Sequence, residues 1–221
     1  MHRSARAPGL LAVIGVVLGA TACGGQPQSL APSADATGPA VTAETQVDAA
    51  TAIDRFDPES QSSWGRASLG TALLMEPDAA RSAALERLDA GDPDVRLAAV
   101  YALSITLEPE DVEPLAPILE SESAAERVLA ASAMVALGDG RGVPVLIESL
   151  GVDELMPFGK PPLPIWRQAR WALLEFTGQD FGLSSATSVE ESAATVADWE
   201  DWWAGAAGSF EAVRTPGRFG P

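Results

Sequence analysis

Apolar residues recur at intervals of three and four along the middle of the chain, in two stretches that repeat one another. This spacing gathers apolar side chains on one face of an α-helix, so each stretch predicts a pair of amphipathic helices. The two stretches superimpose without a gap at an offset of 31 residues, and small alanines at matched positions let neighbouring helices approach closely. The matched pairs are Arg96 and Arg127, Ala99 and Ala130, Ala102 and Ala133, Leu103 and Met134, Val112 and Val143, Leu115 and Leu146, and Leu119 and Leu150.

Helix start and stop signals agree with this register. Asp92 followed by Pro93 is a favoured N-cap with proline at the first helical position. Ser123, with a glutamate three residues later, forms a capping box. The Gly-Asp-Gly run at 138–140 is expected to separate the two helices of the second unit. Each unit is therefore predicted to hold two helices.

The pattern continues in both directions. Residues 66–73 match one unit earlier at an offset of 30, and residues 169–173 match one unit later at an offset of 39. The longer offset requires eight additional residues, which fall in the segment 151–164. Three units and the first helix of a fourth are enough for stacked helix pairs to bury a continuous core. The fold class that follows is all-α.

Two segments carry a resemblance to a known family. Residues 92–103 resemble the first helix, and residues 143–150 the second helix, of short HEAT-like repeats, the type named after the phycobilisome lyases. The resemblance covers about residues 64–182 and implies a right-handed α-solenoid of three to four HEAT-like helix pairs. The stretch 170–182, with the tryptophans that follow it, resembles a C-terminal ending of bacterial HEAT-repeat proteins and implies a Trp-rich capping helix.

Three tryptophans of that last helix, Trp199, Trp202 and Trp203, share one helix face because they are spaced by three and four residues. The terminal unit of a stack needs a cover over its exposed core, so a hydrophobic lid is the first interpretation and a platform for a stacked ligand is the alternative. Ser188 and Glu191 have the spacing of a capping box for this helix.

The first 23 residues have the pattern of a secretory leader. Arg3 and Arg6 precede the apolar run 10–18, and small residues lead to Cys23. This arrangement resembles a bacterial lipobox, although Ala20 stands where that family prefers leucine. The resemblance implies a signal peptide over 1–22 and lipidation of Cys23 by acyl chains such as palmitate, which would hold the protein at the extracytoplasmic side of the cell membrane. The alternative is an ordinary signal peptide that leaves a free thiol.

The rest of the chain divides by composition. Residues 23–50 are rich in small and polar residues and predict a disordered tether, residues 51–212 form the repeat domain, and residues 213–221 form a flexible tail. The formal net charge is −17, with 31 acidic residues against 14 basic ones. Such a chain lacks the basic footprint of nucleic-acid binding, and its contact with the membrane is expected only through the anchor.

Histidine and cysteine are absent after residue 23, since the only histidine is His2 and the only cysteine is Cys23. A Ser-His-Asp triad and a Cys/His metal cage are therefore excluded from the repeat domain. The acidic run 108–113 suits the start of a helix and lacks the Asp-x-Asp-x-Asp-Gly pattern of a calcium loop. No catalytic residue, metal or cofactor is predicted, while a pair of carboxylates for glycoside chemistry stays open.

Two sets of residues are candidates for interactions. Arg96 and Arg127 occupy one position in successive units and are expected to pair with acids of a neighbouring unit, with ligand binding as the alternative. The Pro-rich loop 156–166 carries Phe158, Lys160 and Trp166, and its prolines lower the entropy cost of binding. These three residues are the predicted partner-binding site. The alternative is that the loop merely packs against the helices.

Together these patterns predict a membrane-anchored lipoprotein that acts as a non-catalytic protein–protein interaction scaffold at the cell envelope. Its partner is expected to be a protein or envelope component. The acidic net charge of the chain is consistent with a basic partner, although it can also serve solubility alone. The scaffold itself is expected to be a monomer. One alternative is a structural or assembly factor of an envelope complex. Another is a bilin-lyase-like enzyme, which rests on the family resemblance alone.

Overall fold

The structure, a computed structural model, is mostly helical and contains little strand. It describes residues 48–58, 63–159 and 161–213, and Asp48 begins its folded unit. The predicted signal peptide, Cys23, nearly all of the predicted tether and Lys160 lie outside these residues, as do the side chains of 63–68, 158 and 159.

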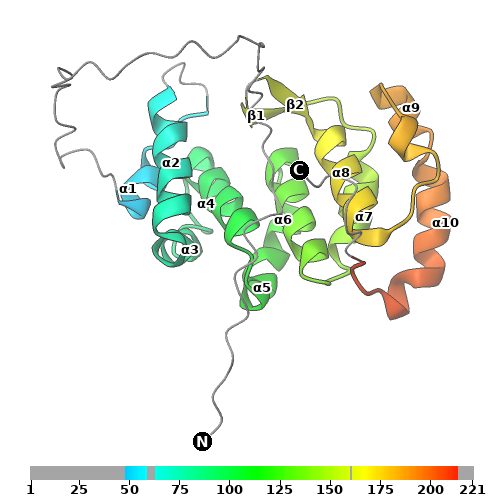
Figure 1. Cartoon of the computed structure of the whole chain (residues 1–221), viewed down its shortest axis with the longest axis horizontal. Helices are drawn as coiled ribbons and strands as arrows, with labels where there is room; N and C mark the ends of the chain where they lie inside the picture. Colours follow the sequence, from blue (N-terminus) through cyan, green and yellow to red (C-terminus); the bar gives the residue numbers. More distant parts are fainter. Residues whose placement is uncertain (1–47, 59–62, 160, 214–221) are drawn as a thin grey trace, which may run out of the picture. The chain divides into compact units, whose positions relative to one another are not determined.

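One layer of the fold is a row of helices that pack side by side, each against the next (Figure 1). Alanines fill the contacts between them: Ala99, Ala130 and Ala169 are all fully buried. A methyl side chain lets two helices approach closely, which is why the alanine positions of the repeat mark this layer. The helices of the row are α2 (Ser63–Met75), α4 (Pro93–Thr106), α6 (Ala124–Ala136) and α8 (Ile165–Thr177).

A second layer covers one side of this row. Helix α3 (Pro77–Leu85) packs against α4, and α7 (Gly142–Ser149) packs against α6 and α8. Between them, the second helix predicted for the first unit is broken into a short α5 (Val112–Leu115) flanked by the 3-10 helices Pro109–Asp111 and Ala116–Glu120. Pro114 and Pro117 explain the break, because proline lacks the N–H that would continue an α-helical ladder.

The 31-residue offset appears again in the hydrogen bonds of α4 and α6. The side chains of Asp92 and Ser123 cap the two helices by accepting from backbone N–H groups of the first turn. Arg96 donates from Nη1 to the carbonyl of Ala90 at 3.0 Å, and Arg127 donates from Nη1 to the carbonyl of Ser121 at 2.7 Å. Equivalent arginines thus bind the carbonyl six residues earlier in both units.

The folded part begins slightly earlier than predicted. Helix α1 (Ala49–Asp54) starts before residue 51, because the Asp48 side chain accepts from the N–H of Thr51 and caps it. The helix packs against α2 and α3, and Arg87 binds Asp54 through Nη2 at 2.9 Å. Helix α1 therefore extends across residues 50 and 51, where the boundary between tether and repeat domain was expected.

The segment expected to be an extended or polyproline-like loop forms a β-hairpin. Strand β1 (Leu155–Gly159) pairs antiparallel with β2 (Pro162–Pro164), and Leu155 lies opposite Pro164. Backbone bonds from Ile165 to Glu154 at 2.8 Å and from Trp166 to Val152 at 3.1 Å close its base. The extended backbone was predicted, whereas the strand pairing was not.

The C-terminal helices follow a turn in which Gly178 and Gly182 adopt positive φ angles of 69° and 81°, conformations that glycine adopts without a steric penalty. Ser188 does form a cap, but on the short α9 (Val189–Ala193) and not on the last helix as expected, because α10 (Val196–Ala206) starts anew after Thr195. Minor 3-10 turns flank this region at Leu183–Ser185 and Ala207–Ser209.

The tryptophans of α10 form a continuous aromatic cluster. Trp199 is fully buried and contacts Phe181 and Trp202 edge-on, at ring-centroid distances of 5.0 and 5.6 Å. Trp203 continues the cluster from Trp202 to Phe210. Phe181 itself has a φ of 48°, a costly angle for an aromatic residue, and its contact with Trp199 helps to hold it there. Trp199 is thus a core residue at this end of the described unit.

Candidate functional site

Two ion pairs join consecutive units of the repeat, one pair within each layer of helices. Arg96 on α4 binds both carboxylate oxygens of Glu126 on α6 through Nε at 3.0 Å. Arg81 on α3 binds Asp111 at 2.7 Å, and this hydrogen bond raises the pKa of the Arg81 guanidinium. Both carboxylates are buried, and a buried carboxylate is tolerated only with such compensation. Both pairs span 30 residues, so they fix one unit against the next.

The arginine positions of the repeat therefore have structural partners. Arg96 pairs with Glu126, an acid of the neighbouring unit, as expected. Arg127 differs, because its guanidinium binds the backbone carbonyls of Ser121 and Glu122 instead of an acid of the next unit. The reason is local: the carbonyls that precede α6 lie within reach, and α8 has no acid in the position equivalent to Glu126.

A third cluster stabilises the turn between α6 and α7. Arg141 binds Asp139 and Glu113 through Nη2, both at 2.7 Å. These hydrogen bonds raise the pKa of Arg141, and the bond from Arg141 holds the pKa of Asp139 below its ordinary value. The cluster lies at the surface and ties the turn to α5 without leaving a free cation there.

The residues predicted to bind a partner are not all at the surface. Trp166 is the second residue of α8 and is only 2% exposed, with the Arg167 guanidinium 5.2 Å from its ring centroid. Trp166 was expected to contact a partner directly, whereas the structure places its side chain in the core, because α8 begins at Ile165. The side chain of Phe158 and all of Lys160 lie outside the described residues.

The hairpin exposes two apolar side chains that were not part of the predicted site. Leu155 is 52% exposed and Leu163 is 46% exposed, while Met156 is buried against the helices. Alternation along β1 explains the contrast between Leu155 and Met156, because successive side chains of a strand point to opposite faces. Strand β2 contacts α8, while Leu163 keeps nearly half of its surface exposed.

A groove between α7 and α10 is a second candidate, and it has a mixed lining. Its volume is about 520 Å³. Ile147 is almost completely buried at its base, whereas Val196 and Trp203 are half-buried. The residues that line it are Pro144, Ile147 and Glu148 from α7, and Val196, Glu200, Trp203 and Ala204 from α10.

A glycine in the α6–α7 turn positions one wall of the groove. A Cβ on Gly140 would lie 2.6 Å from Cη2 of Trp203, so only glycine lets the indole lie this close to the turn. Phe210 packs edge-on against the same indole, at a centroid distance of 5.5 Å. The tryptophan that was expected to form a lid therefore also shapes a surface groove.

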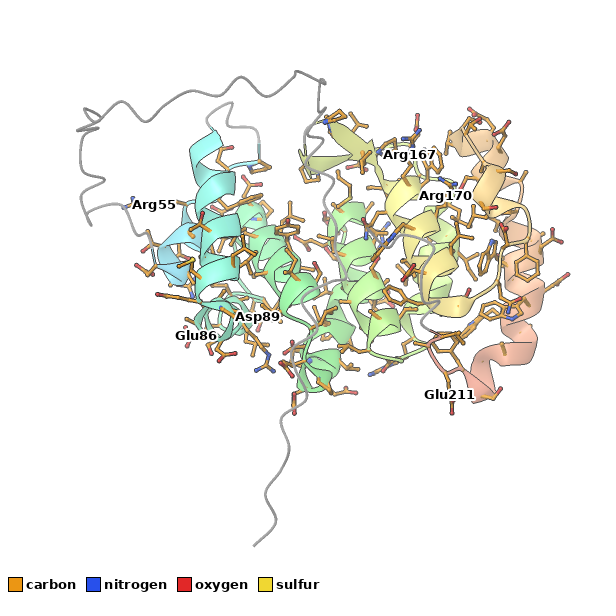
Figure 2. The ribbon with its side chains drawn as sticks, viewed as in Figure 1. Arg55, Glu86, Asp89, Arg167, Arg170 and Glu211 are labelled. Carbon is orange, nitrogen blue, oxygen red and sulfur yellow. The ribbon has the colours of Figure 1, made fainter. Side chains whose placement is uncertain are left out.

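Glu148 and Glu200 give the groove its charge. Both are exposed, and neither forms an ion pair or a side-chain hydrogen bond within the described part of the chain. By contrast, Arg170, labelled on α8 in Figure 2, donates through Nε to the carbonyl of Leu183 at 2.9 Å. The groove thus combines an apolar base with two glutamates that form no ion pair with any residue the structure describes.

Comparison with known proteins gives no match, either to a protein-family model or to a curated sequence. Within residues 48–58, 63–159 and 161–213, no group of three or more His, Cys, Asp or Glu side chains could hold a metal ion. A search of the same residues finds no helix with the length and hydrophobicity needed to cross a membrane.

Proposed function

We propose that this protein is a membrane-anchored lipoprotein that acts as a non-catalytic interaction scaffold at the extracytoplasmic side of the cell envelope. The observation that carries the proposal is the groove between α7 and α10, with its apolar base and two glutamates that form no ion pair among residues 48–58, 63–159 and 161–213. Concave surfaces with an apolar base and few polar groups are typical of binding sites.

The proposed scaffold is a right-handed α-solenoid of three to four HEAT-like helix pairs. Support comes from the side-by-side packing of α4, α6 and α8 and from the two inter-unit ion pairs, each spanning 30 residues. A body pinned in this way presents its surface in one conformation, and pre-organisation lowers the entropy cost of binding. The proposed assembly is a monomer with a protein or envelope component as its partner.

The proposed anchor is Cys23. Residues 24–47 are dominated by small and polar residues, a composition typical of a flexible tether, and a coil of this length spans about 25–30 Å on average. Such a tether gives the folded unit reach from the membrane surface. Acylation contributes about 0.8 kcal/mol per buried CH₂, and two or more chains make the attachment stable.

Membrane fractionation tests the anchor. Cys23→Ser should move the protein from the membrane to the soluble fraction, provided that mass spectrometry shows the leader to be removed. Cys23→Ala serves as a second variant, since it also lacks the thiol. Retention of both processed variants at the membrane would refute the lipoprotein proposal.

Cross-linking in intact cells tests the scaffold. The tagged full chain should co-purify with one protein or envelope component in a constant molar ratio after cross-linking and detergent extraction. A purification that yields only background proteins in variable amounts would reject the scaffold proposal, whatever the outcome for Cys23.

A further inference from the structure

We infer that the groove between α7 and α10 binds a partner segment in which an arginine or lysine is flanked by aliphatic residues. The inference rests on the proposed scaffold function and gives that function a recognition chemistry. The size of the groove, its apolar base and its charge each restrict which kind of segment can bind there.

The volume of about 520 Å³ sets the size of the occupant. Small-molecule pockets begin at about 300 Å³, so this groove accommodates a few side chains and not a whole domain. Ile147 and Trp203 offer apolar surface, on which the methylene stem of a long basic side chain can lie. Aliphatic neighbours of that basic residue can cover Val196 and Pro144 at the edges.

The charge of the lining selects a cation. Glu148 comes from α7 and Glu200 comes from α10, so a basic head group between the helices can meet carboxylates from both sides. Neither glutamate has an ion pair among the described residues, so a partner's cation does not have to displace an internal one. Arginine fits better than lysine, because its planar guanidinium can bind a carboxylate and stack on the Trp203 indole together.

The charge of the whole chain favours the same class of partner. A net charge of −17 attracts basic segments during diffusional encounter and repels acidic ones. Steering of this kind acts chiefly on the association rate, whereas contacts with the groove lining decide where on the chain the basic segment binds.

The chain's own C-terminal segment is the main competing occupant, because residues 214–221 contain Arg214, Arg218 and Phe219. Phe210 packs against Trp203 of the groove lining, so removal of residues 214–221 is one arm of the test below. The proposed occupant is a separate partner, because the net charge of −17 attracts basic segments from outside the chain.

A binding assay with two defined peptides tests the inference. The probes are fluorescein-labelled Ser-Leu-Arg-Leu-Arg-Leu-Ser and the same peptide with glutamate in place of both arginines. The protein is the full chain in phosphatidylcholine nanodiscs, with empty nanodiscs as the blank, and fluorescence anisotropy reports binding. The arginine peptide should bind and the glutamate peptide should not.

Variants then locate the site. Glu148→Gln with Glu200→Gln should weaken binding of the arginine peptide at least about tenfold, which corresponds to about one lost charge-assisted contact. The matched control, Glu120→Gln with Glu122→Gln, removes the same charge from positions outside the groove and should change affinity less than about twofold. Circular dichroism of both double variants should match that of the unmodified chain.

Three results would overturn the inference. One is no binding of the arginine peptide at concentrations up to about 1 mM, the weak end of specific recognition. Another is equal weakening by both double variants, which would show general charge attraction. The third is tenfold tighter binding after removal of residues 214–221, which would identify the chain's own segment as the occupant.

The cell experiment separates this inference from the proposed function. If the Glu148→Gln and Glu200→Gln chain still captures the same partner in a constant ratio, the scaffold proposal stands and the groove is not its site. If the unmodified chain captures no partner while the arginine peptide still binds at the groove, the scaffold proposal fails and the recognition chemistry stands.

Discussion

Removal of Arg96 is the sharpest test of how the units are held together. Arg96→Met keeps the aliphatic bulk of the side chain and deletes the guanidinium that binds both oxygens of Glu126. The Glu126 carboxylate, 1% exposed, is then left with the hydroxyl of Ser121 as its side-chain partner. A buried charge without its counter-ion is expensive, so the variant should be markedly less stable.

The magnitude follows from the burial of the two partners. Breaking a fully buried ion pair costs about 3–5 kcal/mol. The Arg96 side chain is 27% exposed, so water can partly replace it, and we expect a loss of about 2–3 kcal/mol in the free energy of unfolding. Glu126→Leu combined with Arg96→Met should recover most of this loss, because no charge is then buried.

Arg127→Met is the matched control. Arg127 occupies the equivalent position one unit later, yet it binds only backbone carbonyls and leaves no buried acid behind. Its guanidinium is charged but only half-buried, so water can replace it, and its loss should cost about 1 kcal/mol.

Urea unfolding of the full chain at pH 7, followed by circular dichroism at 222 nm, measures all four chains under one condition. The reasoning is refuted if Arg96→Met and Arg127→Met cost the same. It is also refuted if the double variant is less stable than Arg96→Met alone.

Two further predictions concern the core and the surface cluster. Ala99→Asp and Ala130→Asp should each abolish cooperative thermal unfolding, because both positions are fully buried between helices and an unpaired charge there costs several kcal/mol; a native-like melting curve for both would contradict the packing. Asp139→Asn should lower the melting temperature at pH 7, and the difference should vanish as the pH falls through the folded-state pKa of Asp139, because a lowered pKa contributes stability that is present above the ordinary value of 3.8 and lost below it. A difference that persists unchanged at pH 2 would exclude the Arg141 ion pair as its cause.

The features that sequence reasoning predicted well are local ones. Helix caps at Asp92 and Ser123, the glycine break after α6 and the buried alanines all depend on residues within one or two turns of each other. The pairing of Arg96 with an acid of the next unit could also be predicted, because a constant repeat offset brings equivalent positions of neighbouring units together. The structure shows this acid to be Glu126.

The features that were missed depend on contacts between distant segments or on competing local signals. Pro114 and Pro117 were visible in the sequence, yet the apolar spacing around them favoured a continuous helix. The hairpin depends on pairing of Leu155 with Pro164, which proline-rich composition argues against. The groove could not be predicted, since it exists only where α10 packs beside α7.

Helix α1 has a mechanical consequence if the chain is held at Cys23. Any pull from the membrane enters the folded unit at Asp48 and loads α1 first, where Ile53 is buried and Arg87 holds Asp54. Helix α1 packs against α2, α3 and α4, whereas α10 packs against α7. The two helices therefore lie at opposite ends of the row of packed helices. Under tension, α1 would therefore detach first. The helices that form the groove beside α10 would keep their packing.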